Sequence, residues 1–209
     1  MEAAKADQRR EAGLRTQARL LDAALDLISE RGEDAVTLRE LTDAAGANVA
    51  AVSYHFGSLK SVCAAAIERA LERYLDAQQD AVNTLGPEST LEELAAAFAR
   101  PMIRALALGG RDLAVLRIVA RAAIDPPESW DRFDARFDGI RAAVRPALKA
   151  NVPGVKDQDL ILRERCVAGM INWLALAPMG AELGKRSEKQ LERLLVPIIA
   201  GAFRGTSAA

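Results

Sequence analysis

The sequence has few of the residues that build most metal and catalytic sites. Its 209 residues include two cysteines, Cys63 and Cys166, and a single histidine, His55. The cysteines lie far apart, and neither has a cysteine or histidine partner at metal-ligand spacing. We therefore expect reduced thiols, no metal site and no cofactor. His55 has no cluster of carboxylates or thiols around it, so it is expected to serve a structural or binding role rather than a catalytic one.

The sequence also lacks long apolar runs and an excess of charge of either sign. No stretch is long enough to span a bilayer, and the first residues are polar, so we expect a soluble, cytoplasmic protein. The formal net charge is −1, so any surface for nucleic acid must be local. The amino terminus is one candidate, although a solvated tail explains its composition equally well. Its cations are Lys5, Arg9, Arg10, Arg15 and Arg19, against the acidic Glu2, Asp7 and Glu11.

Aromatic residues make up only 4% of the chain, whereas half of it is hydrophobic, with many alanines and leucines. This composition favours helices, and no strand-like alternation or internal repeat is present. Thr37 with Glu40, and Thr90 with Glu93, indicate capping boxes at helix starts. Helical periodicity, caps and breakers predict helices ending at Gly32 and spanning 37–45, 48–55, 58–85, 90–108 (kinked at Pro101), 111–124, 128–150, 157–183 and 187–203.

The helices at 37–45 and 48–55 are short, follow one longer helix and are separated by a tight turn at Gly46. This pattern is typical of the helix-turn-helix, whose second helix lies in the major groove of DNA. Small residues on that helix would let it approach the base edges, and Asn48 and Ser53 could hydrogen-bond to bases. The small positions predicted to face the groove are Val49, Ala50, Ala51, Val52 and Ser53.

The segment 16–66 resembles the amino-terminal domain of the TetR family of repressors. Three linked motifs carry the resemblance: LLDAALDLISERG, TLRELTDAAG and VSYHFGS. The rest of the chain is similar to the family in length and helical pattern. The resemblance implies an all-α protein, with a helix-turn-helix domain at 1–57 and a larger effector-binding and dimerisation body at 58–209.

The resemblance also implies DNA-binding roles for individual residues. Thr37 and Arg39 are expected to contact phosphates, and Asn48, Ala50, Ala51 and Ser53 to face the groove. Tyr54 and His55 match the family's aromatic pair on the DNA backbone, and Phe56 matches a core residue behind the helix. The sequence departs from the family where a lysine often follows the FGS-like turn. Here Leu59 comes first and Lys60 second, and Lys60 is expected to reach a phosphate.

The carboxy-terminal body carries apolar stripes on its last two helices. Val167, Met170, Ile171 and Leu174 form one stripe, with Cys166, Gly169 and Trp173 beside it, and Leu195, Ile198, Ile199 and Ala202 form another. Helices that are apolar on more than one face are buried on more than one side. The resemblance implies that these helices pair with their counterparts in a homodimer.

The family also keeps a small-molecule pocket in this body. Ordinary core packing is the alternative for each candidate lining residue, and Arg117 and Arg121 either hold an anionic effector or are solvated. The candidates are Phe98, Met102, Leu106, Arg117, Arg121, Trp130, Phe133, Met170 and Trp173.

These observations together predict a non-enzymatic, ligand-responsive transcriptional repressor. It would bind a palindromic operator in double-stranded DNA as a homodimer and leave it when a small, largely hydrophobic effector binds. A helical carrier or enzyme that binds a small apolar molecule is the alternative from another class. A helical protein-interaction module is a third. Against an enzyme stands the lack of any clustered nucleophile, base and acid in the sequence.

Overall fold

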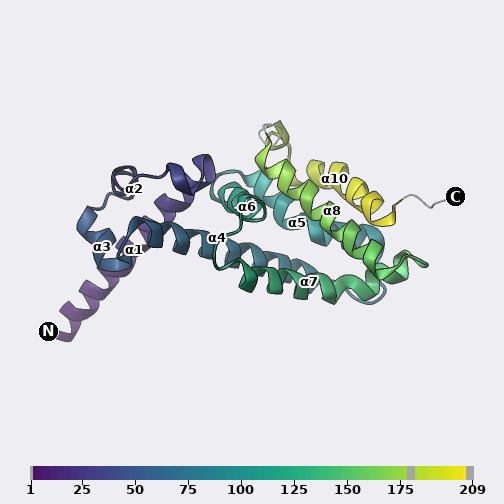
Figure 1. Cartoon of the computed structure of the whole chain (residues 1–209), viewed down its shortest axis with the longest axis horizontal. Helices are drawn as coiled ribbons and strands as arrows, with labels where there is room; N and C mark the ends of the chain where they lie inside the picture. The colour runs from purple at the N-terminus through teal and green to yellow at the C-terminus, as the bar shows by residue number, and fades with distance from the viewer. Residues whose placement is uncertain (1, 178–181, 206–209) are drawn as a thin grey trace. The chain divides into compact units, whose positions relative to one another are not determined.

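A computed structural model describes residues 2–177 and 182–205, with side chains from Asp7 onward (Figure 1). Within these ranges every regular element is helical and no strand occurs, which confirms the predicted all-α class. The chain divides into two compact units, unit 1 over Met1–Ala70 and unit 2 over Leu71–Ala209. The predicted domain boundary after residue 57 falls at the turn before α4 and stays a prediction.

Unit 1 consists of four helices and one short turn. They are α1 (Glu2–Arg31), the 3-10 turn η1 (Glu33–Ala35), α2 (Leu38–Ala45), α3 (Val49–Phe56) and the beginning of α4 (Leu59–Val82). Its core takes apolar residues from each α-helix, including Leu20, Leu25, Leu41, Val52 and Val62, all at most 2% exposed. Burial on this scale fixes the short α2 and α3, which could not persist alone.

Unit 2 contains the rest of α4 and five further described helices. These are α5 (Leu91–Leu108), α6 (Gly110–Ala122), α7 (Trp130–Asn151), α8 (Asp157–Leu176) and α10 (Glu188–Arg204). Helix α10 packs along α5, α6 packs against α8, and α8 and α10 lie side by side (Figure 1). Phe133, Phe203, Leu94 and Met102 are fully buried at the centre of this packing.

Helix α8 is shorter than its predicted span of 157–183. It ends at Leu176, and Ala177 is extended, with φ −68° and ψ 150°. The sequence explains the end, because residue 178 is proline and the residue before a proline is disfavoured in the helical region. The predicted helix beyond residue 177 falls partly on 178–181, outside the described residues.

The apolar stripe on α10 divides differently from the prediction, whereas that on α8 does not. On α10, Leu195 and Ile199 point into the core, whereas Ile198 is 51% exposed. On α8, Val167 and Ile171 are buried, whereas Trp173 is 65% exposed. The predicted stripe on α10 is therefore part core and part surface, because a single helix face about 100° wide holds only some of those positions. On α8 Trp173 lies on the face that was predicted beside the stripe.

Candidate functional site

Helix α2 begins with the predicted capping box. The Thr37 hydroxyl accepts a hydrogen bond from the Glu40 backbone N–H at 3.3 Å, and the Thr37 backbone N–H donates to the Glu40 carboxylate at 3.1 Å. Arg31 at the end of α1 donates to the same carboxylate at 2.9 Å. Hydrogen bonds from the Thr37 hydroxyl and from Arg31 lower the Glu40 pKa from 4.5 to about 2. The start of α2 is thereby tied to α1.

The turn between α2 and α3 depends on Gly46 and Asn48. Gly46 has φ 57° and ψ 41°, the left-handed conformation that favours glycine. A Cβ at this position would lie 3.6 Å from the Arg19 guanidinium, an ordinary contact, so the requirement is conformational rather than steric. Asn48 caps α3, with its side-chain oxygen accepting from the Ala51 N–H at 2.8 Å. The amide nitrogen of Asn48 remains as a donor on the exposed side.

One face of α3, which we call its outer face, is exposed and consists mostly of small residues. It carries Val49 (51% exposed), Ala50, Ser53 and Tyr54 (85% exposed). Ala51 is half-buried. Val52 is 2% exposed and belongs to the core, so its predicted place in the groove is wrong: it lies three positions after Val49 but on the side of the helix that packs on unit 1.

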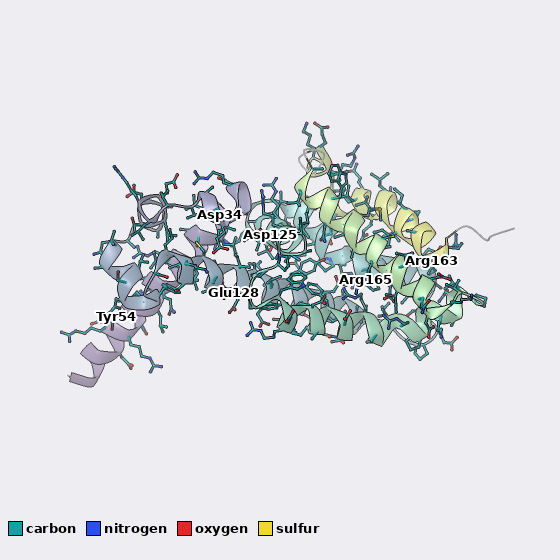
Figure 2. The ribbon with its side chains drawn as sticks, viewed as in Figure 1. Asp34, Tyr54, Asp125, Glu128, Arg163 and Arg165 are labelled. Carbon is teal, nitrogen blue, oxygen red and sulfur yellow. The ribbon has the colours of Figure 1, made fainter. Side chains whose placement is uncertain are left out.

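The aromatic pair after Ser53 is split by burial. Tyr54 projects away from the ribbon (Figure 2). His55 is half-buried. Its ring centroid lies 4.9 Å from that of Tyr54 and 6.5 Å from that of Phe56. His55 also lies against α1, because a Cβ on Gly13 would be 3.6 Å from its Cε1. His55 therefore packs α3 on α1 and remains partly exposed. Phe56, predicted as core, is half-buried.

The two predicted phosphate-binding cations lie on separate helices of unit 1. The Arg39 side chain on α2 is 92% exposed, with a nitrogen–oxygen distance of 3.8 Å to Asp43 one turn along. Lys60 is exposed in the first turn of α4. Thr37 is exposed as well, but its hydroxyl hydrogen already donates to Glu40 at 2.7 Å. A phosphate contact by Thr37 would have to use the opposite side of that oxygen or displace Glu40.

Helix α1 adds a cation that sequence reasoning placed in a basic tail. Arg19 and Thr16 line a hollow together with Gly46, Ala47, Asn48 and Ala51, at the start of α3. Of the other tail cations, Arg9 and Arg10 are exposed, and Arg15 pairs with Glu11 at 3.5 Å. A cation beside the first turn of a helix makes that turn attractive to a phosphate. The sequence could not predict that Arg19 lies beside Gly46, because the two positions are far apart in the chain and meet only in the folded unit.

Unit 2 contains a cavity of about 120 Å³. Phe98 and Trp130, two of the residues predicted to contact an effector, line it together with residues from α4, α6, α7 and α8. That they contact an effector stays a prediction. Met102, Leu106 and Phe133 are instead fully buried core, Met170 is half-buried, and Trp173 is on the surface; none of these five lines the cavity.

Arg117 and Arg121 do not line this cavity either. Helix α6 contributes Val119 to the wall. Residues two positions away on a helix are rotated by about 200°, so Arg117 and Arg121 project away from the cavity. Arg117 is half-buried and Arg121 exposed.

Comparisons with known proteins agree with this architecture. The family model described as "Bacterial regulatory proteins, tetR family" matches residues 20–66, which contain α2 and α3. A second model, described as "Tetracyclin repressor-like, C-terminal domain", matches residues 96–202, just over half of the chain. The chain belongs to the TetR family of bacterial transcriptional regulators.

A solved structure supports the TetR fold over nearly the whole length. It is the crystal structure of the TetR family transcriptional regulator PfmR from Thermus thermophilus, with a TM-score of 0.65 and 22% identity. The match covers 90% of this chain and 99% of that one. No curated protein matches the chain significantly. The TetR-family architecture therefore extends through both units, which confirms the predicted family and fold.

The surface of this TetR-family chain also carries two exposed apolar stripes in unit 2. The stripe on α8 holds Leu162 (60% exposed), Cys166, Gly169 and Trp173, and the stripe on α10 holds Leu194 (44%), Ile198 (51%) and Gly201. Within each stripe the residues are three or four positions apart, so they share one helix face. A Cβ on Gly169 or Gly201 would meet nothing within 4 Å. Among the described helices, none is long and apolar enough to cross a membrane.

Proposed function

We propose that this TetR-family regulator is a repressor that acts in the cytoplasm. It binds a palindromic operator as a homodimer and leaves the DNA when a small, largely hydrophobic effector occupies unit 2. The outer face of α3 is the observation that supports DNA binding. Small, exposed side chains at Val49, Ala50 and Ser53 let a helix backbone approach base edges closely, and the methyl groups suit thymine.

Phosphate contacts flank that face. Arg39 on α2, Lys60 on α4 and Arg19 on α1 supply positive charge, and the α3 amino terminus at Asn48 adds its backbone dipole. Tyr54, the half-buried His55 and Thr37 would add further backbone contacts. Contacts of this kind set orientation and affinity, whereas the outer face of α3 sets the sequence preference.

The apolar stripes on α8 and α10 support the homodimer. Exposed leucine, isoleucine and tryptophan side chains on two adjacent helices would make a patch that a monomer in water rarely leaves uncovered. Two copies that pair through these helices would form a four-helix bundle with two-fold symmetry. The glycines at 169 and 201 would allow the helices to approach closely.

Release by an effector requires two conformations of the dimer. An effector that binds more tightly to the conformation in which the two α3 helices are wrongly spaced for the operator would shift the population to that state. The mechanism needs no covalent step.

The test is binding to the DNA upstream of the protein's own gene. We expect a shifted complex on a native gel with nanomolar to micromolar protein, a footprint with two related half-sites, and weaker binding as salt rises. Random DNA of the same length and composition is the control. Equal affinity for both DNAs at every salt concentration would contradict specific regulation, and absence of any complex would favour the carrier interpretation.

A further inference from the structure

The cavity in unit 2 has the size and walls to hold one aromatic ring. A cavity of about 150 Å³ in another protein binds benzene, and this one measures about 120 Å³. Four aromatic residues line it: Tyr74, Phe98, Trp130 and Phe137. The ring centroids of Trp130 and Phe137 are 6.0 Å apart, and those of Tyr74 and Phe137 are 6.2 Å apart. At these spacings the wall rings are in contact with one another, so they form a joined aromatic surface on which a further ring can pack edge-on or offset.

Two nearly buried polar groups on α4 line the cavity and have spare hydrogen-bonding capacity. Tyr74 is 9% exposed, and its hydroxyl forms no hydrogen bond with the described residues. Burial raises the pKa of Tyr74 to about 12, so the hydroxyl stays protonated and can donate. Gln78 is 5% exposed; its amide nitrogen donates to the Ala97 carbonyl at 3.3 Å, while its oxygen accepts nothing from the described residues.

These two groups act from the same side of the cavity. Tyr74 and Gln78 are four residues apart on α4, so their side chains are neighbours on one helix face. Among the described residues no sealed-in side-chain nitrogen or oxygen lacks a hydrogen-bond partner. The Tyr74 hydroxyl and the Gln78 oxygen are therefore accessible to a ligand. A ligand group that accepts from the Tyr74 hydroxyl and donates to the Gln78 oxygen would satisfy both. Asn172, half-buried on α8, lines the cavity as well.

The charged groups that line the cavity are matched within the protein. Glu164, whose side chain is 1% exposed, accepts two hydrogen bonds from Arg145 at 2.8 and 3.2 Å. Arg141 donates to Asp138 at 2.5 Å and lies 3.6 Å from Asp134. A charged ligand would enter a compensated, mostly apolar site and lose its hydration without gaining an unpaired partner.

From these contacts we infer that the ligand of this cavity is a neutral, single-ring aromatic compound whose substituent both donates and accepts hydrogen bonds. A hydroxyl or a primary amide meets that description. Tyr74 and Gln78 bind the substituent, and the aromatic walls bind the ring. The inference rests on the proposed function, since the ligand class is that of the effector.

Two pairs of nearly isosteric probes test the ligand class. Phenol and toluene differ in hydrogen bonding, and benzamide and benzoate differ in charge. By calorimetric titration of the full chain we expect phenol to bind at least about tenfold more tightly than toluene, and benzamide than benzoate, which is a difference of about 1.4 kcal/mol. Equal affinities within either pair, or no binding by any probe, would overturn the inference.

Conservative variants test the two residues. Tyr74→Phe and Gln78→Met each remove one hydrogen-bonding group with little change of shape. Each variant should bind phenol about tenfold more weakly than the parent protein and bind toluene with unchanged affinity. Matched circular dichroism melts of the free variants check their folding. Unchanged phenol affinity in both variants would show that the α4 pair does not hold the ligand.

Operator binding, measured separately without probe, keeps the two proposals distinct. If the protein binds its operator but none of the probes, the proposed ligand class is wrong and the repressor proposal is unaffected. If the protein shows the expected pattern of probe affinities but binds no operator, the ligand class is supported and the repressor proposal is wrong. Phenol that binds without weakening the operator would overturn its assignment as the effector class.

Discussion

Arg39 is held much more loosely than the arginines that brace unit 1. Arg31 lies 2.9 Å from Glu40, and Arg69 lies 2.5 Å from Asp22. Arg39 is 3.8 Å from Asp43, and its side chain is 92% exposed. An ion pair so open to water contributes little to stability. Arg39 can therefore exchange its carboxylate for a DNA phosphate at small cost, whereas Arg31 and Arg69 serve the fold.

The first prediction concerns these surface contacts. Arg39→Ala and Lys60→Ala should each lower the affinity for every DNA sequence by a similar factor. Each should also reduce the slope of log affinity against log salt concentration by about one. Tyr54→Phe should weaken all sequences without changing that slope, because it removes no charge. Fluorescence anisotropy on operator and random DNA over a salt series measures both quantities.

Arg100→Ala, an exposed arginine on α5, is the matched control and should change neither affinity nor slope. An unchanged slope for Lys60→Ala would show that this lysine binds no phosphate.

The second prediction concerns the buried carboxylate of unit 2. Arg145 binds Glu164 bidentately, and the hydrogen bond to Glu164 raises the Arg145 pKa. Arg145→Met leaves Glu164 unpaired in a site where its side chain is 1% exposed, and should cost about 3 kcal/mol of stability. The double variant Arg145→Met/Glu164→Met should cost much less, because no charge is left behind. Urea unfolding measures all three proteins, and equal losses in the single and double variants would contradict this account.

At the scale of the helix, three starts follow one local rule. Thr37 with Glu40, Thr90 with Glu93, and Ser187 with Gln190 each form a capping box. The backbone hydrogen bond from Thr90 lowers the Glu93 pKa, as the Thr37 hydroxyl does for Glu40. The first two boxes were predicted from sequence and are confirmed, because a box needs only residues three positions apart.

The third prediction is a pH dependence from the α2 box. The Glu40 pKa falls from 4.5 to about 2 on folding. Its stabilisation is therefore complete above about pH 4.5 and disappears as the pH falls toward 2. Glu40→Gln should be less stable than the parent at pH 7, and the difference should shrink steadily between pH 4.5 and 2.

Urea unfolding at pH 7, 4 and 2.5 measures that difference. Glu30→Gln is the control, since Glu30 is an exposed glutamate on α1 outside the box, and it should show a smaller change at pH 7. A difference for Glu40→Gln that stays constant with pH would mean that the box works without its charge.

At the scale of the whole molecule, the exposed stripes decide which substitutions test the dimer. Leu195 is 6% exposed and packs in its own core, so Leu195→Glu would unfold the chain and reveal nothing about pairing. Leu194 and Ile198 are 44% and 51% exposed. They are the positions on α10 where a charge can oppose a partner without disturbing the monomer.

The fourth prediction follows from those exposures. Leu194→Glu or Ile198→Glu should give a folded monomer with much weaker operator binding, because a charge is costly in an apolar interface. Analytical ultracentrifugation gives the mass, and circular dichroism checks the helices. Leu108→Glu, at a leucine 59% exposed on α5, is the matched control and should remain dimeric. A dimeric Leu194→Glu/Ile198→Glu double variant would place the interface elsewhere.

The fifth prediction concerns the operator and its link to the ligand. A symmetric dimer carries two copies of α3, so the footprint should contain inverted half-sites one helical turn apart or a multiple of it. If phenol lowers the affinity of the protein for its operator by some factor, saturating operator DNA must lower the affinity for phenol by the same factor. Titration of phenol into the free protein and into the complex measures this, and a single unrepeated half-site or unequal factors would contradict it.

The sequence alone determined the features that depend on near neighbours. Helix periodicity, the Thr37 box, the turn at Gly46 and the Asn48 cap all rest on residues within four positions, and each is confirmed. The linked motifs over 16–66 identified the family by their resemblance to known sequences, and the family model over residues 20–66 agrees. The end of α8 was missed although Pro178 stands in the sequence, because an apolar run continued past it.

Only the tertiary structure decided which side of each helix meets water. Val52 and Leu195 are buried while Val49 and Ile198 are exposed, although all four are apolar and belong to amphipathic stretches. The sequence proposed Phe98 and Trp130 as lining residues of a pocket, but it did not bring Tyr74 and Gln78 of α4 to the same cavity, since Trp130 is about fifty positions away on α7. Periodicity fixes the angle between side chains on one helix, but the direction of the core is set by the helices that pack around it.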